Sequence, residues 1–226
     1  MVLKKIYESF VNNGIGLDEQ GQQRMKEINT ELSKLSLKFG NNLLKENNAF
    51  LDEFGFSISQ YPDQMAVITD RNLREKAFKA YSSRGNNGNE FDNKDVVLQI
   101  LGLKIEKAKL LGYNNPAEQI LSNKMAHDPQ TVDAFLANIM KYAVAQAEKE
   151  VVEMQKVMDE DIAAGTVEKG STIQPWDWFY YAERVRKAKY DLDEEMTKPY
   201  FEMQNVRAGV FSTASKLYGI QFAKID

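Results

Sequence analysis

The sequence contains no cysteine and only one histidine, His127. Disulfide bonds, thiolate metal sites and a cysteine nucleophile are therefore excluded. Zinc sites are built mainly from histidine and cysteine, and a catalytic zinc ion generally needs three protein ligands. One imidazole cannot make such a centre. The scarcity of histidine also argues against a serine–histidine–aspartate triad. Because His127 directly precedes a helix start, we interpret it as a turn or surface residue.

Several other signals are missing. No apolar run approaches the roughly 18 residues of a membrane span, and no charged-then-apolar secretory segment opens the sequence, so we expect a cytoplasmic protein with no membrane partner. The 29 basic residues are outnumbered by 33 acidic ones. Without a basic stripe there is no electrostatic footprint for nucleic acid. The G-x-G-x-x-G and G-x-S-x-G motifs are also absent.

Apolar residues recur instead at spacings of three and four, which is typical of amphipathic helices. One such face predicts a helix from about Asp18 to about Phe50, and another predicts a helix that Asp128 caps and Gly165 ends. Both exceed 30 residues, so each is expected to span a large body. The inward stripe predicted for the second helix consists of Val132, Phe135, Ile139, Ala143, Ala147, Val151, Met154, Met158 and Ile162.

Shorter helices are predicted for the rest of the chain. Their expected ranges are 70–84, 93–111, a helix opening at Asn115, 175–189 and 199–218. Only residues 54–59, F-G-F-S-I-S, alternate like a strand, and one strand cannot form an independent sheet. The expected fold is therefore mainly α, with at most one short strand or hairpin. We expect one helical unit over residues 1–226, with a possible internal boundary near 163–172.

Two acidic clusters are candidate cation sites. Asp159, Glu160 and Asp161 lie near a helix C-terminus, where the helix dipole disfavours them. They need either a compensating cation or free solvation, and we favour solvation. In the second cluster, the position that requires glycine in a calcium loop holds Met196, so a helix cap is the simpler interpretation. The acidic residues of this second cluster are Asp191, Asp193, Glu195 and Glu202.

Five aromatic rings fall within the six residues from Trp176 to Tyr181. They point to almost every side of a helix, which is typical of a helix start buried between neighbouring elements. One interpretation is that this segment anchors a short helix between the two long ones. The other is that it forms a wall of a ligand cleft, with the candidate lining residues Trp176, Trp178, Tyr180 and Tyr181.

Six ordered blocks cover nearly the whole chain and carry a family resemblance. They are EINTELSKLSLKFGNNLLKENNAF (27–50), DRNLREKAFKAYSSRGNN (70–87), DNKDVVLQILGLKIEKAKLLGYNNPAEQIL (92–121), MAHDPQTVDAFL (125–136), IQPWDWFYYAER (173–184) and KPYFEMQNVRAGVFSTASKLYGIQF (198–222). Together they resemble the bacterial peptidyl-dipeptidase and oligopeptidase A group of the thimet-oligopeptidase zinc metallopeptidases. The peptidyl-dipeptidase Dcp branch is the best match.

The resemblance implies an almost wholly helical fold with a deep channel that admits short peptides. It also implies a zinc ion on an H-E-x-x-H helix, whose glutamate activates the zinc-bound water. This sequence contains no H-E-x-x-H, so no zinc ligand, cofactor site or catalytic residue can be assigned to it. The segment between Phe50 and Asp70 is also shorter than the family pattern.

We therefore expect the chain to be an internal fragment that walls the channel of a zinc-dependent oligopeptidase. The parent family is enzymatic, but the fragment itself is expected to be inactive. Its expected partners are short peptides, through the parent enzyme, and the missing catalytic portion. Self-association through an exposed apolar patch is a further expectation. The alternative is a stand-alone helical module that binds proteins or peptides without catalysis.

Overall fold

The computed structural model describes residues 2–190 and 198–223, and within them it contains helices and no β-strand. The two longest, α2 (Glu19–Phe54) and α7 (Pro129–Ala163), have 36 and 35 residues, which confirms the two predicted helices of more than 30 residues. The other α-helices are α1 (Val2–Asn12), α3 (Tyr61–Val67), α4 (Arg71–Ser82), α5 (Lys94–Leu110), α6 (Pro116–Leu121), α8 (Trp178–Tyr190) and α10 (Met203–Tyr218). Short 3-10 turns are η1 (Ile58–Gln60), η2 (Pro175–Asp177) and η3 (Lys198–Phe201).

The predicted helix starts are confirmed by their caps. The Asp18 carboxylate accepts a hydrogen bond from the Gly21 amide at 2.8 Å, and the Asp128 carboxylate accepts one from the Thr131 amide at 2.7 Å. Each bond satisfies a backbone donor that the first helical turn leaves without a partner. Asn115 caps α6 in the same way.

The strand-like alternation of residues 54–59 does not correspond to a strand in the structure. Phe54 is the last residue of α2, and Gly55 follows with φ 77°, a left-handed conformation that turns the chain sharply away from the helix. The turn brings Phe56 back to Phe50, with ring centroids 5.5 Å apart. The alternation of apolar residues therefore reflects a helix end and the turn after it rather than a pleated strand.

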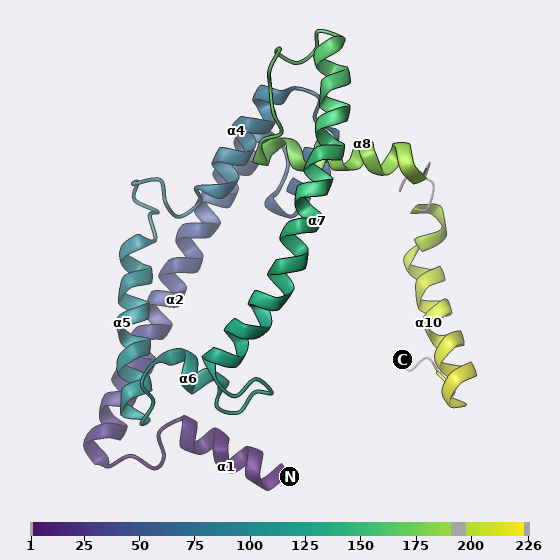
Figure 1. Cartoon of the computed structure of the whole chain (residues 1–226). Coiled ribbons are helices and arrows are strands. Elements are labelled where there is room, and N and C mark those ends of the chain that lie inside the picture. The colour runs from purple at the N-terminus through teal and green to yellow at the C-terminus, as the bar shows by residue number, and fades with distance from the viewer. Residues whose placement is uncertain (1, 191–197, 224–226) are drawn as a thin grey trace.

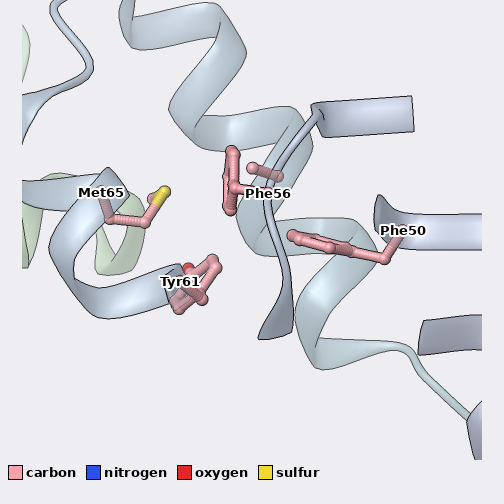
Figure 2. Packing of buried hydrophobic residues seen from close by; sticks show 5 residues of the cluster. Phe50, Phe56, Tyr61 and Met65 are labelled. Carbon is pink, nitrogen blue, oxygen red and sulfur yellow. The ribbon is translucent and has the colours of Figure 1, made fainter. Parts of the chain in front are cut away.

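A first hydrophobic core forms where this turn meets α3 and α4. Figure 2 shows Phe50, Phe56, Tyr61 and Met65 converging from α2, the turn and α3. Tyr61 stacks on Tyr81 of α4, with centroids 3.9 Å apart. Helix α3, which the sequence pattern did not predict, thus owes its place to Tyr61 and Met65, both buried.

A second core joins the end of α7 to α8. Met154, Met158 and Tyr181 are buried there, with Ile162 and Val185 packed around them. In Figure 1, α2 and α5 run side by side, and α7 extends from the α6 end of the molecule to its contact with α8. The segment 163–172, proposed as an internal boundary, lies in the loop between α7 and α8 apart from the last residue of α7.

A buried carboxylate of α2 holds the loop that follows α4. Glu46 of α2 is only 7% exposed and accepts hydrogen bonds from the Gly85 amide and from the side chains of Asn87 and Asn89. Three donors stabilise a buried carboxylate whose desolvation would otherwise be costly. The polar loop therefore folds onto α2 and connects α4 to α5.

The inward stripe predicted for α7 packs within the chain only along part of its length. Met154 and Met158 are buried, whereas Phe135 is 63% exposed and Ile139 is 45% exposed. The prediction fails between Phe135 and Ala143 because the described elements leave the stripe exposed there; α7 packs against α6 near its start and against α8 near its end. None of the described helices is both long and apolar enough to cross a membrane.

Candidate functional site

A polar cavity of about 590 Å³ lies between the start of α4, the end of α7 and α8. Two of the candidate cleft residues, Tyr180 and Tyr181, line it, and Trp176 and Trp178 are not among its lining residues. The charged side chains that line it include Arg71, Arg74, Asp161 and Arg184.

A buried carboxylate and two arginines connect α4 to the start of α8. Asp177 is fully buried, and its Oδ2 accepts a hydrogen bond from Arg71 Nη2 at 2.8 Å while its Oδ1 accepts one from Arg74 Nη2 at 2.9 Å. The hydrogen bond to Asp177 raises the pKa of the Arg71 guanidinium. Both arginines reach the same carboxylate because residues three apart share a face of a helix.

The same network also holds the loop that precedes α8. Arg71 donates to the Ser171 hydroxyl and to the Thr172 carbonyl, both at 3.1 Å, and the Gln174 amide donates to Asp177 at 3.1 Å. Arg74 is 1% exposed and donates further hydrogen bonds to two backbone carbonyls of the α3–α4 connection. The network therefore fixes the position of α8 relative to α4.

A second carboxylate, Asp161, connects the end of α7 to α8. It accepts a hydrogen bond from the Tyr181 hydroxyl at 3.0 Å and forms an ion pair with Arg184. Burial alone lowers the pKa of Arg184, but the hydrogen bond and charge of Asp161 outweigh it and raise that pKa. The expected solvation is therefore wrong for Asp161, because α8 brings a cation to it, whereas Asp159 and Glu160 are exposed.

The aromatic cluster divides between the two cores. Trp176 packs against the first core, with its ring 6.1 Å from that of Phe78, and Trp178 packs against the second. Tyr181 is fully buried, and burial raises the pKa of its phenol. The Arg74 guanidinium lies over the Tyr180 ring, 4.2 Å from its centroid, a distance typical of a cation–π contact. Contact between this wall and a peptide stays a prediction.

Sequence reasoning did not identify Arg71, Arg74 or Arg184 as members of the site. A usable signal was present for the first two, since Arg71 directly follows the Asp70 helix cap and Arg74 lies three positions after Arg71, on the same face of the helix. For Asp177 the signal is its place inside an aromatic cluster, because a carboxylate that is buried there must find a cation.

Comparison with known proteins gives the family. Residues 64–226 match Peptidase family M3. The chain belongs to peptidase family M3.

Relatives of this M3 chain match nearly all of it. It is 31% identical to dipeptidyl carboxypeptidase of Salmonella typhimurium over 97% of the chain and 36% of that relative. It is 32% identical to oligopeptidase A of the same organism, over 93% of the chain and 35% of the relative. It is 33% identical to organellar oligopeptidase A of Arabidopsis thaliana, over 94% of the chain and 31% of the relative. The M3 chain thus spans about a third of the length of these relatives.

The described residues of the M3 chain do not fit a zinc centre. His127 is exposed, with φ 63° in the turn before α7, and no three His, Asp or Glu side chains in the described ranges gather as metal ligands. The carboxylates of Asp161 and Asp177 are bound by arginines. Of the candidate calcium residues, Asp191, Asp193 and Glu195 lie outside the described residues, and the Glu202 side chain makes no capping bond to α10.

Proposed function

We propose that this chain forms part of the helical body that walls and supports the channel of a zinc-dependent M3 peptidase, which hydrolyses short peptides. The observation that carries the proposal is the family match over residues 64–226, together with oligopeptidase and dipeptidyl carboxypeptidase relatives that align with 93% of the chain or more. In this proposal Tyr180 and Tyr181 belong to a wall of the cleft, and Trp176 and Trp178 support that wall from the two cores.

The zinc ion and the residues that activate water belong, in this proposal, to other parts of the enzyme. Three protein ligands are the usual requirement for catalytic zinc, and this chain has one histidine. The purified 226-residue chain, supplied with zinc, should therefore show no hydrolysis of short acyl-peptides. Turnover that a chelator abolishes would refute this assignment.

A chimera tests the positive half of the proposal. The segment of Salmonella typhimurium dipeptidyl carboxypeptidase that aligns with this chain would be replaced by residues 1–226. The chimera should hydrolyse short peptides in a zinc-dependent manner, and the same enzyme with the segment deleted should not. A folded chimera that binds zinc but cleaves no peptide would contradict a role for this chain in the channel body.

The second candidate is a stand-alone helical module that binds peptides or helices without catalysis. The observation that favours it is the exposed apolar surface of α10, which includes Val210 at 59% and Leu217 at 69% exposure. The reading frame beyond Asp226 distinguishes the two. Continuation into an H-E-x-x-H motif supports the peptidase body, and a stop codon supports the module.

A further inference from the structure

The chain exposes far more surface than a compact protein of its mass. Its solvent-accessible surface is 16640 Å² for a mass of 25.8 kDa. A compact monomer of this mass exposes only ~10,500 Å², because accessible surface scales with mass to the power of about 0.73. The excess is therefore ~6,000 Å².

Part of this excess lies on the first half of α7. We define the α7 face as the six large apolar residues of this half that are exposed, between 44% and 66% of their surface: Phe135, Leu136, Ile139, Met140, Tyr142 and Val144. The same helix continues into the second core, where Met154 and Met158 are buried. The α7 face is thus an extension of an existing core that no described element of the chain covers.

We propose that the α7 face is covered by the remaining polypeptide of the M3 peptidase and becomes interior in the whole enzyme. This inference rests on the proposed function. A second copy of the chain could cover the α7 face but would leave most of the excess exposed, because stable interfaces bury ~800 Å² per partner and large obligate ones ~2,500 Å², against an excess of ~6,000 Å². The relatives supply the required amount of protein, since this chain spans only 36% of the length of Salmonella typhimurium dipeptidyl carboxypeptidase.

Hydrogen exchange in the isolated chain and in the chimera tests the inference. The backbone amides of residues 135–144 should exchange at least ~100-fold more slowly in the chimera, because burial adds opening free energy to an otherwise solvated helix. Fast exchange there, in a chimera whose two cores are protected, would overturn the inference. A discrete dimer of the isolated chain with equally protected amides would also overturn it, by assigning the face to a second copy.

Two substitutions on opposite sides of α7 separate the face from the helix itself. Leu136 and Ala145 are nine positions apart, which is about two and a half turns, and both are exposed in the isolated chain. Leu136→Asp should abolish the protection in the chimera, and Ala145→Asp should retain it. Equal effects of the two variants would count against an apolar contact at this face.

Failure of this inference can be distinguished from failure of the proposed function. Peptide hydrolysis by the chimera reports on the function, and amide exchange in α7 reports on the contact. If the chimera does not fold, the same two substitutions at the aligned positions of the unmodified Salmonella typhimurium enzyme decide the question by thermal unfolding. The inference then predicts a lower melting temperature for the substitution at the position aligned with Leu136 and an unchanged one for the substitution aligned with Ala145.

Discussion

Replacing Asp177 by asparagine would remove the charge on which both arginines of α4 depend. The substitution keeps the size of the side chain and leaves an oxygen to accept the hydrogen bond from the Gln174 amide. It leaves Arg74, which is 1% exposed, with a buried charge that no carboxylate balances. Arg71 is 27% exposed in its side chain and can be partly solvated instead.

The expected loss of stability follows from this asymmetry. Removing one partner of a buried ion pair costs about 3–5 kcal/mol, and the solvation available to Arg71 places this case near ~3 kcal/mol. Native domains are stable by about 5–15 kcal/mol, so the loss is a large fraction of the total. With a urea dependence of ~3 kcal/mol per molar, the unfolding midpoint should fall by ~1 M.

Equilibrium urea unfolding of the wild-type chain and of two variants measures this effect. The control is Glu53→Gln, because Glu53 pairs with Lys76 at 2.9 Å while both side chains are about half exposed or more, at 48% and 68%. An exposed pair contributes at most ~1 kcal/mol, so the control should shift the midpoint by no more than ~0.3 M. Equal shifts for the two variants would refute the view that Asp177 holds α8 to α4 by charge.

Burial, followed by the influence of Tyr81, raises the pKa of Tyr61 to about 12. Between pH ~10 and 12 the unfolded chain therefore loses this phenol proton while the folded chain retains it, and the stability falls as the pH rises through this range. Tyr61→Phe should leave the urea midpoint near neutral pH almost unchanged and flatten its decline above pH ~10; an equally steep decline would exclude Tyr61 as its source. Glu46→Gln should speed amide exchange in the loop after α4 by ~10-fold, since charge-assisted hydrogen bonds are lost, and the exposed Glu90→Gln in that loop should have no such effect. Met158→Ala should cost about 2–5 kcal/mol in urea unfolding, because it leaves a cavity in the second core. Met140→Ala in the same helix should stay within ~0.5 kcal/mol, because its side chain is 54% exposed; similar losses for both would place the second core elsewhere.

The helices could be predicted from the sequence largely because their ends carry local signals. Asp128 and Asn115 form the capping bonds that their positions indicated, and Asp18 caps the helix that was predicted to begin near it. Such a bond joins residues two or three apart, so the sequence itself contains both partners. The end of the helix predicted over 199–218 also carries a local signal, since Gly219 follows α10 in a left-handed conformation.

The contacts of the candidate site could not be predicted because they join distant residues. Arg74 and Asp177 are 103 positions apart, and nothing local in either segment identifies the other. Asp161 illustrates the same point, since its cation comes from α8 across an intervening loop. The spacing of apolar residues indicates which face of a helix is apolar, but it does not indicate which element covers that face. Phe135 lies on the apolar face of α7 and is exposed within this chain.

The aromatic segment has a consequence for how the chain melts. Two separate hydrophobic cores would ordinarily lose structure in two steps. Here Trp176 contributes to the first core and Trp178 and Tyr181 contribute to the second, so the disruption of either removes an anchor from the other. Heating should therefore give a single calorimetric transition for the two cores, because six consecutive residues make them one cooperative unit.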